Sequence, residues 1–140
     1  METECLTLID IGYMEKILLS LDETYDKVII KKIIKKMISN INDCTTLHNG
    51  LKMPWLGFGV FQIKDGQDVE YAVRNALEIG YRSIDTASVY GNEIGVGKAI
   101  KESGIPREDI FLTTKVWNDD QRKKRTQAAF QESLKRLETD

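Results

Sequence analysis

The sequence has few of the residues that metal centres and disulfide frameworks require. Its 140 residues include two cysteines, Cys5 and Cys44, and one histidine, His48. Zinc ligands normally come in closely spaced sets, and disulfide-dependent folds carry a higher density of cysteine. These absences argue against a metal site and against a disulfide scaffold, so both cysteines are expected to be reduced.

Long apolar runs and a strong net charge are also missing. No segment approaches the roughly 18 consecutive apolar residues of a membrane span, and the N-terminus carries acids where a secretory signal carries bases. The formal net charge of −2 gives no general attraction to nucleic acid or to an anionic membrane. With 41% hydrophobic and 30% charged residues, the composition is typical of one globular domain, which we expect in the cytoplasm.

The first third of the chain differs in composition from the rest. Residues 1–43 are rich in isoleucine and lysine and poor in glycine, and pairs of the two residue types alternate over 29–36. This repeat of four is close to the helical period of 3.6, which predicts a helix over about 22–40 and a weaker one around 15–19. A lysine-striped helix suits an anionic membrane or a partner, but a solvated face opposite a packed one is favoured. The segment is therefore a helical extension of unknown role.

Strand and turn signals follow in a regular order. Asn49-Gly50 lies between two short runs, which predicts a β-hairpin with His48 as a surface residue beside its turn. Strand-like segments then alternate with helical patterns. The predicted strands are 55–62, 81–87 and 110–117, and the predicted helices are 65–80, 92–104 and 121–138. A strand–helix repeat indicates parallel βαβ units, which build a doubly wound sheet or a β/α barrel.

The three predicted helices have apolar faces that we expect to be buried. The residues on these faces are Val69, Ala72, Val73, Ala76 and Leu77 in the first helix, Ile94, Gly97, Ala99 and Ile100 in the second, and Ala128, Ala129, Phe130, Leu134 and Leu137 in the third. Gly80 and Gly104 are expected to end the first two helices.

Two glycine motifs and one basic run are weak signals of ligand binding. The GVGK at 95–98 lacks the earlier glycine and the following Ser or Thr of a phosphate-binding loop. The GFG at 57–59 lacks the third glycine of a dinucleotide fingerprint, although its glycines would let a ligand approach the backbone closely. The basic QRKKR at 121–125, which opens the third predicted helix, has no interleaved aromatics, so a solvated face is favoured over a nucleic-acid site.

An acid, a tyrosine and a lysine lie near the ends of two predicted strands. Side-chain alternation lets Asp85 and Lys115 point inward near the carboxyl ends of adjacent barrel strands, which is where barrel enzymes keep their catalytic groups. Tyr90 would then lie beside a lysine held by a carboxylate and would donate a proton to a carbonyl oxygen. Spacing alone favours the alternative, an ordinary buried ion pair with a tyrosine packed nearby.

At these residues the sequence resembles a known family. The segment GYRSIDTASVYGNEIGVG at 80–97 is similar to the first signature of the aldo-keto reductase superfamily. TTKVW at 113–117 resembles the third-strand segment of that family, and LHNGLKMPWLGFGVFQ at 47–62 resembles its N-terminal hairpin and first strand. The resemblance covers about residues 45–140.

The resemblance implies a fold and an activity. The fold is part of a (β/α)8 TIM barrel, with the hairpin and the first three βα units in residues 44–140 and the helical extension in 1–43. The activity is the reduction of aldehydes or ketones to alcohols with a nicotinamide cofactor. NADPH is the expected cofactor, and NADH stays open as an alternative.

The resemblance also implies roles for individual residues. Tyr90 matches the general acid, Lys115 the lysine whose charge acts on that tyrosine, and Asp85 the acid paired with the lysine. Phe61 and Trp117 match positions that line the pocket for a small carbonyl substrate. The positions that match the cofactor-binding end of the site are Gly59, Val60, Phe61 and Asp85.

The sequence departs from the family pattern near its end. The family has a further catalytic histidine at the end of its fourth strand and adenosine-phosphate contacts in its last barrel units, and His48 cannot replace that histidine. We therefore expect a truncated chain with three of the eight βα units of a barrel. The alternative to an enzyme is a non-catalytic barrel fragment or interaction module that associates through its exposed barrel edge.

Overall fold

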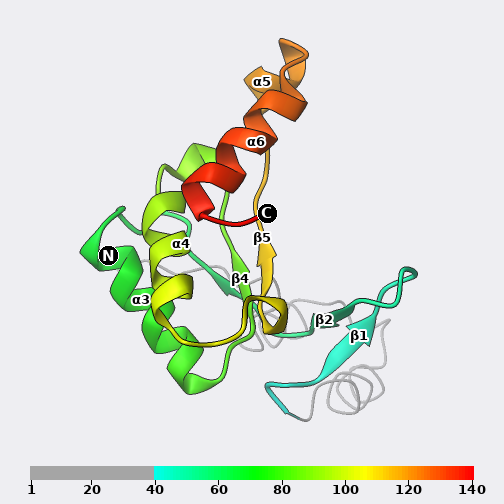
Figure 1. Ribbon diagram of the computed structural model, residues 1–140, viewed down its shortest axis with the longest axis vertical. Helices are drawn as coiled ribbons and strands as arrows, with labels where there is room; N and C mark the ends of the chain where they lie inside the picture. Colours follow the sequence, from blue (N-terminus) through cyan, green and yellow to red (C-terminus); the bar gives the residue numbers. More distant parts are fainter. Residues whose placement is uncertain (1–39) are drawn as a thin grey trace, which may run out of the picture.

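The computed structural model describes residues 40–140 of the chain. The N-terminal helices predicted from the sequence fall on residues 1–39, outside this described part. Within residues 40–140 the fold is α/β. It contains a three-stranded parallel sheet, a separate two-stranded hairpin, and helices that follow each parallel strand (Figure 1). The α/β class predicted from the alternating patterns is therefore confirmed for the part of the chain that is described.

The hairpin predicted around Asn49-Gly50 is present. β1 (Cys44–Thr46) and β2 (Lys52–Pro54) pair in antiparallel register. Gly50 adopts a φ of 85° in the loop between them, a left-handed conformation that glycine takes without a steric cost. His48 lies in the same exposed loop, as predicted for a surface residue.

Three short strands form the parallel sheet, in the order β3–β4–β5. They are β3 (Phe58–Gly59), β4 (Ser83–Asp85) and β5 (Phe111–Thr113). Each is shorter than its predicted segment, because the chain turns aside soon after the ladder ends. Ile63 N donates back to Val60 O at 3.2 Å, which closes a turn directly after β3. The residues beyond the strands therefore form loops at the carboxyl edge of the sheet.

Three helices lie side by side along one face of the sheet (Figure 1). They are α3 (Gln67–Ile79), α4 (Glu93–Glu102) and α6 (Thr126–Leu137). Short helical turns occupy the loops, namely η1 (Ser88–Tyr90), η2 (Arg107–Asp109) and α5 (Asn118–Arg122). The end of α3 is as predicted, with Gly80 in the left-handed region at φ 114°. None of the helices within residues 40–140 is long and apolar enough to span a membrane.

The apolar core lies between the sheet and these helices. At its centre Ile84 of β4, Val73 of α3 and Val96 of α4 are completely buried. The other buried members of the core are Val60, Val69, Leu77, Ala99, Ile100, Ile110 and Leu137. Burying one side chain of this kind stabilises the fold by about 1.5–3 kcal/mol relative to exposure. The core therefore fixes the strand ends from which the candidate site is built.

The predicted start of the third helix is wrong. The chain forms α5 and then α6, with Lys124 between them at φ 56°, a left-handed conformation that interrupts a right-handed helix. The basic run at 121–125 therefore lies at the C-terminal end of α5 and in the turn that follows it. Positive charge at a helix C-terminus is favourable because the helix dipole is negative there.

Some residues predicted on buried faces are exposed. Ile94 in the first turn of α4 is 57% exposed, Phe130 in α6 is 44% exposed, and Ala128 is exposed as well. The buried residues of α6 are Ala129, Ser133 and Leu137, which repeat every four positions. Because α6 packs only along this stripe, its contact face is narrower than the apolar pattern predicts.

The glycines of the GVGK motif lie inside α4 and serve helix packing. A Cβ atom at Gly95 would overlap the Val69 side chain of α3, and one at Gly97 would overlap the backbone of Leu137 at the end of α6. α4 therefore approaches both neighbouring helices at positions where only glycine fits. This packing explains the two glycines without a phosphate ligand.

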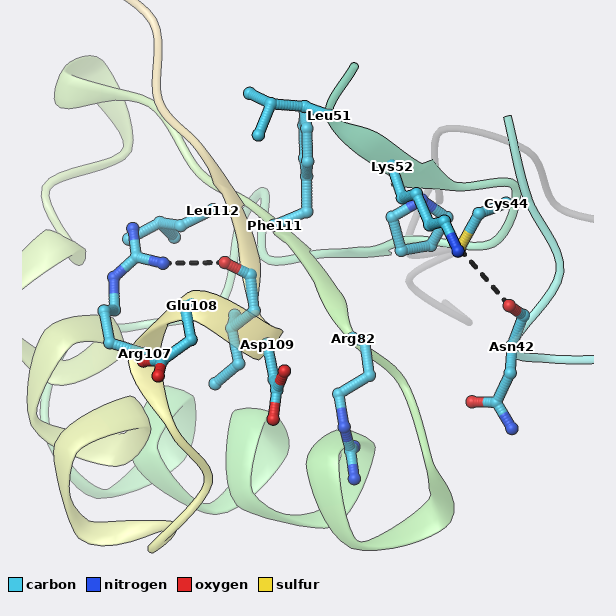
Figure 2. Close-up of a pocket in the computed structure, with 12 residues that line it drawn as sticks. Asn42, Cys44, Leu51, Lys52, Arg82, Arg107, Glu108, Asp109, Phe111 and Leu112 are labelled. Atoms are coloured by element: carbon cyan, nitrogen blue, oxygen red, sulfur yellow. Dashed lines mark hydrogen bonds between the residues drawn. The ribbon is translucent and has the colours of Figure 1, made fainter. Parts of the chain in front are cut away.

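A cleft with a volume of about 590 Å³ separates the hairpin from the N-terminal ends of β4 and β5 (Figure 2). Two of its basic groups are held by backbone carbonyls: Arg107 donates to Ile110 O at 2.6 Å, and Arg82 donates to Tyr81 O at 2.7 Å. The cleft lies at the opposite end of the strands from Asp85.

Candidate active site

The carboxyl ends of the three parallel strands meet at one edge of the sheet. The register places Gly59 of β3 beside Asp85 of β4, and Asp85 beside Thr113 of β5. Val60 N donates to Asp85 O at 3.1 Å, and Thr86 N donates to Thr113 O at 2.9 Å, so the pairing continues one residue past each strand. Side chains that follow the strands are therefore brought to the same edge, as parallel topology requires.

Asp85 and Lys115 form an ion pair at this edge. The Lys115 Nζ lies 2.5 Å from Asp85 Oδ1. The Asp85 side chain is 14% exposed and the Lys115 side chain 46% exposed. Lys115 was expected to point into a closed barrel, but here solvent reaches it and weakens the attraction between the two charges. Sequence reasoning predicted this pair from strand alternation, and the pair is present.

Tyr90 lies directly beside the ion pair. It ends the turn η1, and Gly91 follows in the left-handed region at φ 68°, which redirects the chain towards α4. The Lys115 Nζ lies 5.3 Å from the centre of the Tyr90 ring, within the range of a cation–π contact. The Phe61 ring packs on Tyr90 from another side, with ring centroids 4.9 Å apart and planes tilted by 53°. The edge therefore brings together a carboxylate, an ammonium, a phenol and an exposed aromatic ring.

The backbone after β5 is tied to the turn that carries Tyr90. Both the backbone N–H and the hydroxyl of Ser88 donate to Lys115 O, at 3.1 and 3.0 Å. Ser88 thus fixes the position of the Lys115 backbone relative to η1. Sequence reasoning did not single out Ser88, because its partner is 27 residues away in the chain.

The other residues predicted for the site, Gly59, Val60 and Trp117, differ in how far they are buried. Val60 is completely buried and its side chain belongs to the apolar core, while its carbonyl accepts hydrogen bonds within the fold. Gly59 is buried at the end of β3. Trp117, 44% exposed, lines a depression with a volume of about 390 Å³ together with Ser88 and Val89. Trp117 therefore lies along the turn that carries Tyr90.

Two buried polar residues behind this edge were not given a role by sequence reasoning. Asn92 is completely buried and Glu93 is 1% exposed. Glu93 accepts hydrogen bonds from the Thr114 hydroxyl at 2.6 Å and from Arg136 Nε at 2.7 Å. The sequence shows these two residues only as a polar pair at the start of a predicted helix. Such a pair more often caps the helix than forms a buried hydrogen-bond network.

The arrangement is suited to proton transfer next to a stabilised charge. A phenol can donate a proton to an oxygen atom, and a nearby ammonium stabilises the negative charge that the phenol acquires. Asp85 holds the ammonium in place. Within residues 40–140, no three His, Cys, Asp or Glu side chains are grouped so that they could share a metal ion.

Comparison with known proteins identifies the family. The profile of the Aldo/keto reductase family matches residues 55–140, more than half of the chain, and the chain belongs to this family. Glyoxal reductase of Bacillus subtilis is 52% identical over 104 residues, which is 74% of this chain and 38% of that protein.

Solved structures of the same family share the fold of the described part. An aldo/keto reductase from Brucella melitensis is 54% identical and superposes with a TM-score of 0.66, over 71% of this chain and 37% of that one. A Bombyx mori aldo-keto reductase, solved in complex with NADP, is 40% identical with a TM-score of 0.62, over 69% of this chain and 34% of that one. The chain thus spans little more than a third of the length of these relatives.

Proposed function

We propose that residues 44–140 are the N-terminal part of the β/α barrel of a carbonyl reductase that uses a nicotinamide cofactor. The observation that carries this proposal is the convergence of Asp85, Lys115 and Tyr90 at the carboxyl ends of adjacent parallel strands. Barrel enzymes place their catalytic groups at this end of the strands. Membership of the aldo-keto reductase family supports the reaction class.

Each residue of this group has a distinct role in the proposed reaction. Tyr90 donates its phenolic proton to the substrate oxygen as the carbonyl is reduced. The Lys115 ammonium, 5.3 Å from the ring centre, stabilises the negative charge that develops on Tyr90. Asp85 accepts the hydrogen bond from Lys115 and keeps the ammonium beside the ring.

The cofactor is proposed to be NADPH, with NADH as the alternative. The aldo-keto reductase from Bombyx mori that resembles this chain was solved with NADP. When bound, a reduced nicotinamide supplies the hydride that the carbonyl carbon receives. The residues of this chain that would hold its nicotinamide end are those at the end of β3 and β4, namely Gly59, Val60, Phe61 and Asp85. Because the Val60 side chain is buried and its backbone N–H and carbonyl are hydrogen-bonded within the fold, Val60 would contribute by fixing the end of β3 and not by a polar contact of its own.

The substrate class is proposed to be small aldehydes and ketones. A relative that is 52% identical is named a glyoxal reductase, which makes glyoxal a suitable probe. Phe61 and Trp117, which are 50% and 44% exposed, would form apolar walls around such a compound. The cytoplasmic location expected from the sequence stays a prediction.

A second candidate function is a non-catalytic module that docks on a complementary barrel portion. The order of the described sheet supports it, because within residues 40–140 β5 is an outer strand that pairs with β4. Outer strands of this kind present backbone groups that can pair with another chain.

A titration with NADPH separates the two candidates. Trp117 lines a depression beside the turn that carries Tyr90, and Trp55 precedes β3, so cofactor binding at the proposed site should quench tryptophan fluorescence. Quenching with a low-micromolar dissociation constant, together with NADPH consumption when glyoxal is added, supports the reductase. No quenching up to millimolar NADPH contradicts it and leaves the docking module.

A further inference from the structure

Asn92 is completely buried, two residues after Tyr90, and its side chain makes three hydrogen bonds. The amide nitrogen donates to Val60 O and to Ile63 O, both at 2.9 Å, and the amide oxygen accepts from the Thr86 hydroxyl at 2.8 Å. Backbone carbonyls only accept, so the amide must turn its two N–H groups towards them. The orientation of the amide is therefore fixed by its partners.

This use of the asparagine differs from the common one. Asn92 stands at the N-cap of α4, where an asparagine usually accepts a hydrogen bond from the first turn, yet its side chain makes no capping bond. Asp65 caps the helix instead, because its carboxylate accepts a hydrogen bond from Gly95 N at 2.9 Å. The Asn92 amide is thereby released for contacts with the loop after β3.

The loop that Asn92 holds carries Phe61. The two carbonyls that receive its N–H groups, Val60 O and Ile63 O, lie on either side of Phe61 and Gln62. Gln62 adopts φ 65°, a conformation unusual for a residue with a side chain. Such a turn persists only where its surroundings fix it. Asn92 supplies this constraint from a loop about 30 residues away in the chain.

We propose that Asn92 is a positioning residue that shapes the carbonyl pocket by holding the turn of residues 60–63, so that the Phe61 ring packs against Tyr90. The ring contact is 4.9 Å between centroids. That Phe61 lines a carbonyl pocket rests on the proposed function, whereas the hydrogen bonds from Asn92 to the turn of residues 60–63 do not. Because Phe61 is a wall of the pocket and not a proton donor, loss of the hold should weaken substrate binding more than the chemical step.

The first test needs neither cofactor nor substrate. In nuclear magnetic resonance spectra of the chain, the Asn92 side-chain amide protons should exchange slowly with solvent, and the Phe61 and Tyr90 rings should show a direct nuclear Overhauser contact. In Asn92→Ala this ring contact should be lost. It should persist in Val73→Ala, a control that removes buried side-chain volume from α3 and leaves the hydrogen bonds of Asn92 intact.

The second test measures reduction of glyoxal with NADPH. Losing one buried hydrogen-bonding group typically costs about tenfold in an equilibrium, so KM for glyoxal should rise about tenfold in Asn92→Ala while kcat changes by less than about threefold. Val73→Ala should leave both constants unchanged once the folded fraction is accounted for.

The outcomes are distinguishable. A retained ring contact in Asn92→Ala, or rapid exchange of the Asn92 amide in the unmodified chain, overturns the inference. If Asn92→Ala does not fold, the exchange rate of the Asn92 amide in the unmodified chain still tests whether that amide is held by its buried hydrogen bonds. An unmodified chain that neither binds NADPH nor reduces glyoxal overturns the proposed function instead, while the ring contact still decides whether Asn92 positions Phe61.

Discussion

The Thr114 hydroxyl donates a hydrogen bond of 2.6 Å to the buried carboxylate of Glu93. Thr114 directly precedes Lys115, and Glu93 follows the turn that carries Tyr90 by three residues. The second oxygen of Glu93 accepts from Arg136 in α6 at 2.7 Å. A single buried side chain therefore joins the segment after β5 that carries the lysine, the start of α4 just after the turn that carries the tyrosine, and the last helix.

We expect Glu93→Gln to destabilise the fold by about 2 kcal/mol, because hydrogen bonds to charged groups contribute roughly 1.5–3 kcal/mol. The amide has one donor end, which would face either the Thr114 hydroxyl or the Arg136 guanidinium. Urea unfolding followed by circular dichroism measures this change. Glu102→Gln is the matched control, since Glu102 pairs with Arg74 at 3.4 Å and both side chains are about half exposed. Exposed pairs contribute about 0–1 kcal/mol, so equal losses in the two variants would contradict the prediction.

Tyr90→Phe tests the proposed proton donor. The contacts of Tyr90 with Phe61 and Lys115 involve the ring, so we expect the variant to keep its stability within about 0.5 kcal/mol and to keep NADPH binding. Glyoxal reduction should fall at least about 100-fold, because positioned acid catalysis typically contributes 10²–10⁴-fold. Tyr71→Phe, on the exposed surface of α3, should change neither quantity. Unchanged turnover in Tyr90→Phe would remove Tyr90 from its proposed role.

Gly97→Ala should destabilise the protein although alanine is the better helix former. In an open helix the change from glycine to alanine stabilises by about 1 kcal/mol. Here the added Cβ would overlap the backbone of Leu137, and overpacking of this kind costs about 1–3 kcal/mol. Thermal unfolding should therefore show a lower Tm for Gly97→Ala.

The control for Gly97→Ala is a glycine with free space around it. Gly104 has no heavy atom within 4 Å of a Cβ built on it, although its φ of 71° is left-handed. Gly104→Ala should cost only the strain of this conformation, about 1 kcal/mol. A Tm of Gly97→Ala above that of the unmodified chain would show that α4 and α6 do not pack as closely as described.

Periodic patterns predicted the elements that bury a broad face. The apolar spacing of Val69, Val73, Ala76 and Leu77 indicated α3, and all four are buried. The same reasoning failed for Ile94 and Phe130, because the faces of α4 and α6 depend on which neighbours they pack against. The break at Lys124 was missed for a related reason: the apolar pattern that continues after it does not report backbone conformation.

In the candidate site, too, some contacts could be predicted from the sequence and others could not. Strand alternation and spacing predicted that Asp85 and Lys115 would meet, because parallel strands bring their carboxyl ends to one edge. The positions of Asn92 and Glu93 could not be predicted, since all of their side-chain partners except Thr86 lie between 21 and 43 residues away. Which side chains are paired behind the edge follows only from the packed structure.

The contact between α3 and α4 gives a prediction about pH. Lys98 donates to Glu70 at 2.8 Å across the two helices. This hydrogen bond, and then the charge of Glu70, raise the pKa of Lys98 above its usual value of 10.5. A pKa raised by folding means that the folded chain holds the proton more tightly than the unfolded chain does. The stabilisation is therefore fully present below pH 10.5 and is lost as the pH rises through the folded-state pKa of Lys98.

Glu70→Gln removes the charge that raises the pKa of Lys98. Between about pH 6 and pH 9, where a lysine is protonated and a carboxyl group is ionised, Tm should be lower in Glu70→Gln than in the unmodified chain by a constant amount. Once the pH has risen through the folded-state pKa of Lys98, the two should converge, because the neutral amine no longer attracts the carboxylate. Glu78→Gln, an exposed position on the same helix, controls for the change in net charge. A gap between Glu70→Gln and the unmodified chain that stays constant through this range would show that the contact of Glu70 with Lys98 does not couple proton binding to folding.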